Sequence, residues 1–450
     1  MLQTRNHLKR RIGFVDRIFR SAVLRQLTTL KRGEMTVADS QGVNEFGEPD
    51  TDLRASVFVA DPQFYRRVVF GGGLGAAESL MSGEWRCDDL TALLRIFVRN
   101  MHVADDMDTG FSRLRRWMAR FGHWLRRNTP HGSKRNIHEH YDLGNEFYSL
   151  FLDETLNYSC GVFESPDSTM LDASIAKMER VCRKLELRPS DHLVELGTGW
   201  GALAIYAAKN FGCRVTTTTI SDEQYKLARR RVESEGLAGR VEVLRKDYRR
   251  LDGQFDKLVS IEMIEAVGHE YYGAFFRKCS DLLKTDGMML LQSIVIADER
   301  YRQYLRTVDF IRRYIFSGGS LPSISVLTQV AAYAGETRML QLEDFAPHYA
   351  ETLRHWRRGF LNRIDEVHSL GFDERFIRMW TYYLCYCEAA FEERQVNLVQ
   401  MLFAKRGCRV DPSRLDGAAP SHGTIDSARD DGGTFSGSTV PEHLTLESIR

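Results

Sequence analysis

The sequence has no long hydrophobic run, little proline and almost no net charge. The longest apolar candidate, residues 288–297, is interrupted by Gln292 and Ser293 and falls short of the roughly 18 residues that a membrane helix needs. The 450 residues contain 10 prolines, and 62 Lys plus Arg face 61 Asp plus Glu, giving a formal net charge of +1. With 43% hydrophobic residues, this composition excludes a disordered or collagen-like chain and indicates a globular protein of about two to three domains.

Paired cysteine motifs and a secretory signal are also missing. The 8 cysteines form no CxxC pair and have no His partners at zinc spacing, which indicates reduced thiols rather than a disulfide framework. Residues 1–20 lack an apolar core of roughly 7–15 residues followed by a small-residue cleavage site. We therefore expect a cytoplasmic protein, and we assign no metal site.

Two stretches are strongly basic. Residues 1–33 have Asp16 as their only acid, and their apolar residues recur at helical spacing. This pattern predicts a basic amphipathic helix that either attaches to an anionic bilayer or docks on the protein's own N-terminal domain. Residues 111–136 mix basic residues with the interleaved aromatics Trp117, Phe121 and Trp124 and contain no acid, which is typical of a membrane headgroup region. We expect peripheral association with the inner face of the membrane and no nucleic-acid partner.

From residue 168 onward the pattern becomes regular. Short β-branched runs alternate with helical stretches of about 10–15 residues, which predicts a mostly parallel sheet covered on both faces. The expected organisation is a small α+β domain at 1–110, a basic aromatic linker at 111–139, a catalytic domain at 140–411 with a helical insertion at about 302–396, and a disordered tail at 412–450.

Residues 192–208 (HLVELGTGWGALAIYAA) combine a strand, a glycine-rich turn and the start of a helix. Such a turn places a nucleotide-type ligand at the carboxyl end of a first parallel strand. The spacing GxGxG, and the lack of an acid at Thr219, weaken a dinucleotide interpretation. Glu195 lies inside the strand, where a carboxylate needs polar partners.

VELGTGWG resembles motif I of class I S-adenosylmethionine-dependent methyltransferases, and together with YSCG upstream it resembles the cyclopropane-fatty-acyl-phospholipid synthase and mycolic acid cyclopropane synthase family. The similarity runs from HYDLGNEFY (140–148) to about residue 409 and, more weakly, includes AAESLMSGEW (76–85). It implies an α/β fold with a Rossmann-like, seven-stranded, mostly parallel sheet, a helical substrate-binding insertion and a small N-terminal α+β domain.

The resemblance also implies a cofactor site for S-adenosylmethionine. Its residues are Tyr158, Ser159, Gly197, Gly199, Trp200 and Gly201 for the methionine part and sulfonium, Thr219 and Gln224 for the ribose, and Asp247 and Tyr248 for the adenine. Glu195, in the strand before the turn, is assigned to the same site. Gln224 has a second interpretation, because Ser221 to Gln224 also matches a helix capping box.

The family's chemistry implies a second site. An alkene attacks the sulfonium methyl, and the resulting cation loses a proton to a bound bicarbonate as a ring closes. The positions that match the bicarbonate ligands are Cys160 through its backbone amide, Glu265, Gln292, Ile294 and Tyr349. The family usually has His where this chain has Gln292, and LLQSIVIADERY (290–301) resembles plant-type members instead. Glutamine donates a hydrogen bond but does not titrate near neutrality.

Structural roles compete with these assignments. Cys160, Tyr158 and Tyr349 also suit an ordinary core. Glu265 is less easily explained in this way, because an unpaired carboxylate after a buried strand is costly.

The expected function is methylene transfer to cis double bonds of unsaturated phospholipid acyl chains in a bilayer. Products with a methyl branch or an exocyclic methylene, a small-molecule N-methyltransferase and a catalytically silent binding protein are the alternatives. A homodimer is compatible with the sequence.

Overall fold

The computed structural model describes residues 13–49, 52–101 and 143–411. The expected basic linker and the expected disordered tail lie outside these residues. No helix among the described residues is long and apolar enough to cross a bilayer.

The N-terminal part combines helices with a small four-stranded sheet. Its four strands pair in the order β2-β1-β3-β4, and alternate residues of β1 and β3 are buried. Its elements are α1 (Phe14–Leu27), β1 (Glu34–Asp39), β2 (Gly42–Gly47), β3 (Arg54–Val59), α2 (Gln63–Met81), β4 (Trp85–Cys87) and α3 (Leu90–Arg99).

Helix α1 is divided between burial and exposure. Its second half is anchored by buried Val23 and Leu27, and Arg20 forms an ion pair of 2.6 Å with Asp39. In its first two turns, Phe14 and Ile18 keep 78% and 55% of their surface exposed. The helix therefore docks on its own unit and also presents an apolar tip to solvent.

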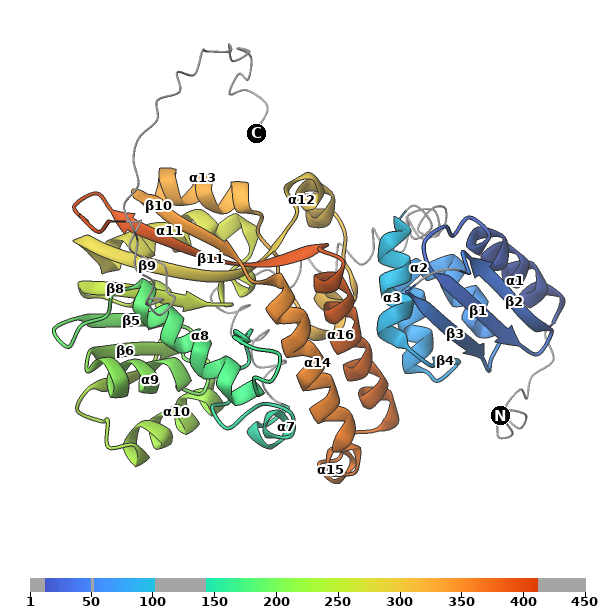
Figure 1. Ribbon diagram of the computed structural model, residues 1–450, viewed down its shortest axis with the longest axis horizontal. Helices are drawn as coiled ribbons and strands as arrows, with labels where there is room; N and C mark the ends of the chain where they lie inside the picture. The colour runs from blue at the N-terminus through green and yellow to red at the C-terminus, as the bar shows by residue number, and fades with distance from the viewer. Residues whose placement is uncertain (1–12, 50–51, 102–142, 412–450) are drawn as a thin grey trace, which may run out of the picture. The chain divides into compact units, whose positions relative to one another are not determined.

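The second part is built on a seven-stranded sheet with strand order β10-β11-β9-β8-β5-β6-β7 (Figure 1). Strands β5 to β9 pair in parallel, and β11 joins β9 and β10 in antiparallel fashion. This confirms the predicted fold class. The strands are β5 (His192–Leu196), β6 (Arg214–Thr219), β7 (Val241–Arg245), β8 (Phe255–Ile261), β9 (Leu283–Ile296), β10 (Thr337–Asp344) and β11 (Val396–Lys405). Strand β10 lies within the stretch for which the sequence predicts helices.

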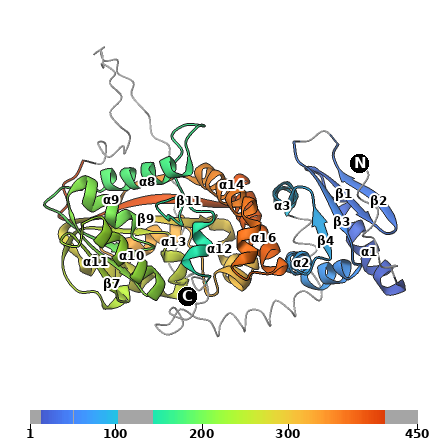
Figure 2. The same ribbon diagram turned by 90° about the horizontal axis from the view of Figure 1, so that it is seen from below.

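Helices cover both faces of this sheet (Figures 1 and 2). The core of one face includes residues of α8, α9 and α10, and that of the other includes residues of α11 and α13. The longer helices are α8 (Met170–Lys184), α9 (Ala202–Phe211), α10 (Asp222–Ser234), α11 (Tyr272–Leu282), α12 (Asp298–Leu305), α13 (Ile324–Ala334), α14 (Ala346–Asn362) and α16 (Glu374–Glu392). Short ones are α7 (Asn145–Ser149), η1 (Tyr248–Arg250), η2 (Ile264–Ala266), η3 (His269–Tyr271), η4 (Ile311–Ile315) and α15 (Ile364–Ser369).

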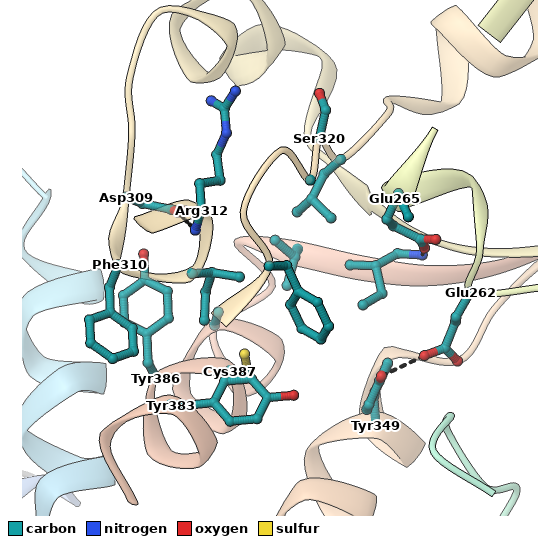
Figure 3. Close-up of a pocket in the computed structure, with 18 of the residues that line it drawn as sticks. Glu262, Glu265, Asp309, Phe310, Arg312, Ser320, Tyr349, Tyr383, Tyr386 and Cys387 are labelled. Carbon is teal, nitrogen blue, oxygen red and sulfur yellow. Dashed lines mark hydrogen bonds between the residues drawn. The ribbon is translucent and has the colours of Figure 1, made fainter. Parts of the chain in front are cut away.

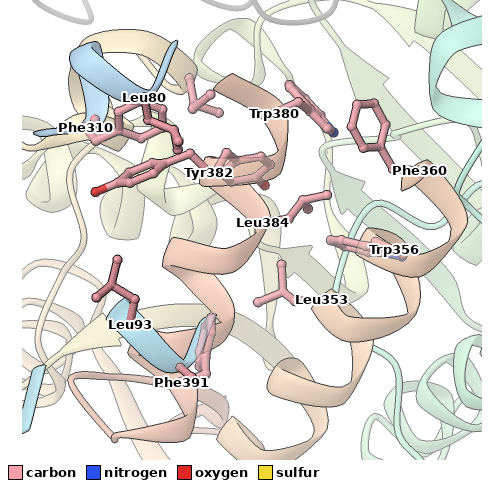
Figure 4. Packing of buried hydrophobic residues seen from close by; sticks show 14 of the residues in the cluster. Leu80, Leu93, Phe310, Leu353, Trp356, Phe360, Trp380, Tyr382, Leu384 and Phe391 are labelled. Carbon is pink, nitrogen blue, oxygen red and sulfur yellow. The ribbon is translucent and has the colours of Figure 1, made fainter. Parts of the chain in front are cut away.

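Helices α14 and α16 pack on one another through large aromatic residues (Figure 4). Trp356 and Phe360 of α14 and Trp380 of α16 are almost completely buried. Aromatic side chains bury large apolar areas, so this pair of helices contributes a large part of the apolar core.

Candidate active site

One cavity of about 730 Å³ opens at the carboxyl ends of β5, β6, β8 and β9. The strand order reverses between β5 and β8, and ligands of open α/β sheets bind at such a switch point. The predicted site residues that line the cavity are Tyr158, Ser159, Glu195, Gly197, Gly199, Trp200, Thr219, Gln224, Asp247, Tyr248, Glu265, Ile294 and Tyr349. Gly201, Cys160 and Gln292 do not line it.

The turn after β5 depends on its glycines. Gly197, Gly199 and Gly201 have φ of +101°, +53° and +88°, a region that other residues rarely adopt. A Cβ at Gly199 would meet no atom within 4 Å, so open space faces the turn. This open cradle fits a ligand that approaches the backbone closely.

Two buried charges lie beside the turn. Glu195 accepts a hydrogen bond of 2.5 Å from Thr217, and burial raises its pKa to about 7. Lys177 of α8 is fully buried, and its Nζ donates to Asn157 (3.0 Å) and Ser159 (2.9 Å). Burial lowers the pKa of Lys177, whereas nearby carboxylates favour its charge. Lys177 is not among the residues predicted from the sequence, although its position on the buried face of an amphipathic helix is a readable signal.

The predicted ribose residues contact one another. Thr219 Oγ1 donates to Gln224 Oε1 at 2.8 Å, and both residues line the cavity. The backbone N–H of Gln224 also donates to Ser221 Oγ at 3.3 Å, so Ser221 caps α10. The capping role and a place at the cavity therefore coexist.

Asp247 and Tyr248, the two residues predicted to contact the adenine, lie further along the carboxyl edge of the sheet. Asp247 forms an ion pair of 2.6 Å with Arg249. Although Asp247 is partly buried, its hydrogen bonds and ion pair with Arg249 lower its pKa. Tyr248 packs edge-on against Phe275, with ring centroids 5.6 Å apart.

Aromatic side chains line the cavity away from the turn. The hydroxyls of Tyr158 and Tyr383 are 2.8 Å apart, and the Tyr158 ring lies 5.1 Å from Trp356. Phe310, Tyr383 and Tyr386 also line the cavity (Figure 3). Such a lining excludes water and offers aromatic faces to a positive charge.

A carboxylate that the sequence analysis did not single out lies at the centre of the second predicted site. Glu262 Oε1 accepts hydrogen bonds from the Cys160 backbone N–H (3.0 Å) and from Gln292 Nε2 (2.7 Å). Its Oε2 accepts one from the Tyr349 hydroxyl at 2.5 Å (Figure 3). The structure thus brings Cys160, Gln292 and Tyr349 together, but around Glu262.

Glu265 occupies a separate position, which corrects the expected grouping. Its Oε1 accepts from the Ile294 backbone N–H (2.6 Å) and from the Ser293 hydroxyl (3.0 Å). Its Oε2 has no hydrogen-bond partner among the described residues. Burial and the neighbouring Glu262 charge raise the pKa of Glu265 to about 8. The physical reason for the division is that Glu262 directly follows β8, whereas Glu265 lies one short turn later in η2.

The expected S-adenosylmethionine and bicarbonate fit the structure differently. The open glycine turn, with polar groups on β5, β6 and α8, suits the cofactor. For bicarbonate, each expected donor already has a carboxylate partner: Cys160, Gln292 and Tyr349 bind Glu262, and Ile294 binds Glu265. The residues present therefore do not fit a bound bicarbonate.

The sheet, the glycine turn and the cavity define a class I S-adenosylmethionine-dependent methyltransferase. The profile of the mycolic acid cyclopropane synthetase family matches residues 128–401. The chain belongs to this family and is an enzyme, which confirms the resemblance seen in the sequence.

Named relatives match most of the chain. The tuberculostearic acid methyltransferase UfaA1 of Mycobacterium tuberculosis is 37% identical over 369 residues, which is 79% of this chain and 85% of that protein. The cyclopropane-fatty-acyl-phospholipid synthase of Escherichia coli K12 is 35% identical over 371 residues, 81% of this chain and 90% of that protein. Among solved structures, the mycolic acid cyclopropane synthase CmaA1 in complex with SAH and CTAB has a TM-score of 0.57 at 32% identity, covering 60% of this chain and 98% of that one.

Proposed function

We propose that this enzyme transfers a methylene group from S-adenosylmethionine to the cis double bond of an unsaturated phospholipid acyl chain and forms a cyclopropane ring. The observation that carries the proposal is a cavity that joins the glycine turn to an aromatic, apolar region and to a buried carboxylate. The similarity to a protein named cyclopropane-fatty-acyl-phospholipid synthase supports the choice of substrate.

When bound, the cofactor supplies an electrophilic methyl group. The backbone of the glycine turn lets it approach closely, and the buried ammonium of Lys177 suits the carboxylate of a methionine moiety. Thr219 and Gln224 offer a hydroxyl and an amide to the ribose. These residues orient the ligand toward the aromatic region.

The aromatic region receives the acyl chain. Its rings exclude water, which would trap a carbocation, and their faces stabilise positive charge. Ile294 and Tyr349 lie where this region meets the carboxylates.

A methyl branch is the second candidate product, because the relative UfaA1 is named a tuberculostearic acid methyltransferase. Both products need the same alkylation, and they differ in what happens to the cation afterwards. The ring requires a base near the former methyl group, whereas a saturated branch requires a reductant as well.

The test uses the purified full chain, S-adenosylmethionine and vesicles of a cis-monounsaturated phosphatidylglycerol. Mass spectrometry of the released fatty acids should show a gain of one CH₂ that survives mild hydrogenation. Vesicles of a fully saturated lipid serve as the control and should show no gain. Unchanged unsaturated chains would contradict the proposal.

We also propose that the protein binds the cytoplasmic face of the membrane through the exposed tip of α1. Phe14 and Ile18 are exposed beside Arg17, an arrangement that suits shallow insertion at an anionic surface. The second basic stretch, residues 111–136, lies outside the described residues.

Replacing Phe14 and Ile18 by Ser should weaken flotation with anionic vesicles by about tenfold or more, because each side chain loses up to roughly 1.5–3 kcal/mol of apolar burial. The matched control replaces exposed Val43 of β2 by Ser. Equal flotation of both variants and the wild type would show that another surface binds the membrane.

A further inference from the structure

The side chain of Glu262 occupies the place where the family resemblance predicts a bound anion. Three donors from three separate elements converge on its two oxygens: the Cys160 backbone N–H before α8, Gln292 on β9 and Tyr349 on α14. Donors arranged in this way favour the ionised form of a carboxylate. Glu262 also lines the cavity, together with Tyr349 and Glu265 (Figure 3). Ile294 is a further lining residue.

We propose that Glu262 is itself the catalytic base of this enzyme and that its carboxylate replaces bicarbonate. This inference rests on the proposed function, since it assigns the proton-removing step of that reaction. It differs from what the family resemblance implies, namely a carboxylate that only orients a separate anion.

The backbone holds Glu262 in an unusual conformation. Its φ is +48°, in the left-handed region that residues other than glycine seldom adopt. Its own N–H donates to the Gln292 backbone oxygen at 2.8 Å, which ties the end of β8 to β9. Strain of this kind persists where surrounding contacts enforce it, and it gathers at functional sites.

The charged groups around Glu262 and Glu265 favour a state in which only one of these two carboxyl groups is ionised. Because the pKa of Glu265 is raised to about 8, Glu265 is mainly protonated at neutral pH and adds no second full charge. Burial raises the pKa of Glu262, while the three hydrogen-bond donors and the positive charge of Lys177 favour its ionised form. A carboxylate more basic than one in water suits proton removal near neutrality.

The step balances without another reactant. The alkene electron pair forms a bond to the methyl carbon as the carbon–sulfur bond breaks, and sulfur keeps that pair. A Glu262 oxygen then takes a proton from the former methyl group, and the released C–H pair closes the third bond of the ring. The proton leaves Glu262 for water once the products have left the cavity.

The decisive experiment measures turnover of the full-length wild type in carbonate-free buffer under argon, with and without added bicarbonate. If Glu262 is the base, the two rates agree within about twofold. A rate that falls by about tenfold or more without bicarbonate, and returns when it is added, would overturn the proposal. Absence of lipid product in both buffers would instead contradict the proposed function, and the inference with it.

Two variants sharpen this result. Glu262→Gly removes the carboxylate, tolerates the positive φ and leaves the three donors free to hold an anion. It should be nearly inactive in carbonate-free buffer and should recover by about tenfold or more with bicarbonate. A variant that binds S-adenosylhomocysteine normally but shows no recovery would contradict the assignment of an anion-binding position.

Glu262→Gln fills the same space with an amide and should not be rescued by bicarbonate. Glu366→Gln, an exposed change on α15, is the matched control and should behave like the wild type in both buffers.

Discussion

The two ends of the cavity are built in different ways. The cofactor end consists largely of backbone: one turn after β5 with three positive-φ glycines, flanked by short polar contacts on β6 and α10. The proton-removing end consists of side chains and backbone donors from separate elements that meet at Glu262 and Glu265. The first end rests on local chain geometry, whereas the second is a network in which each buried group depends on the others. Substitutions should therefore separate binding from turnover.

The sharpest test of this difference compares the two carboxylates. Glu262→Gln should lower kcat by about 10²–10⁴-fold, because the base is lost. Glu265→Gln should lower it by only about tenfold or less, since Glu265 is already mainly neutral at pH 7 and an amide oxygen still accepts from Ile294. Calorimetric titration with S-adenosylhomocysteine should show affinities within about threefold of the wild type for both. If Glu265→Gln lowered kcat more than Glu262→Gln did, Glu265 and not Glu262 would be the base.

Substitutions in the glycine turn should instead lower cofactor affinity. Gly197→Val must adopt a φ near +101°, and its Cβ would lie 3.2 Å from Met263. A strain of about 1–3 kcal/mol predicts a loss of cofactor affinity of roughly 5- to 150-fold. Gly239→Val, at an open surface position, is the control. Wild-type affinity for S-adenosylhomocysteine in Gly197→Val would show that the turn does not shape the ligand site.

The buried carboxyl group of Glu265 also predicts that the difference in stability between the wild type and Glu265→Gln depends on pH. Glu265 has a folded pKa of about 8, above its ordinary 4.5, so the folded protein holds its proton more tightly than the unfolded chain does. Its contribution to stability is complete below about pH 4.5 and is lost as the pH rises toward 8. Glu265→Gln carries no such proton. As the pH rises through this window, the free energy of unfolding of the wild type should fall, relative to that of Glu265→Gln, by about 1.4 kcal/mol for each pH unit.

Urea unfolding at pH 5, 6.5 and 8 measures this difference. A gap between the two proteins that stays constant across the three pH values would show that Glu265 is ionised throughout.

The smallest effect is expected at Cys160. Its contribution to the network is a backbone N–H, and burial raises the pKa of its thiol, so a thiolate is disfavoured. Cys160→Ser keeps the amide and should retain turnover within about threefold of the wild type. Intact-mass analysis during turnover checks the same point, because a covalent adduct on Cys160 would contradict a purely backbone role.

The contrast between the two ends also explains what the sequence could predict. A strand, a glycine turn and a helix follow one another along the chain, so the fold class and the edge of the sheet that holds the cofactor are readable from local pattern. Glu262 and Glu265 are only three residues apart, and the backbone φ after β8 decides which of them reaches Tyr349. Tertiary contacts set that angle, and the spacing of residues along the sequence does not indicate it.

Lys177 and β10 were missed for related reasons. Lys177 lies among apolar residues on α8, and its partners Asn157 and Ser159 come from a loop about twenty residues earlier in the chain. Strand β10 has only weak alternation, and its pairing with β11 outweighs the helical appearance of its surroundings.

The central claim is that a base in the cavity removes a proton from the transferred methyl group. The most direct measurement supplies S-adenosylmethionine with a trideuterated methyl group and weighs the lipid product by mass spectrometry. The account predicts a ring that retains two deuterium atoms and resists mild hydrogenation. A product that retains all three deuterium atoms as a methyl branch would contradict it.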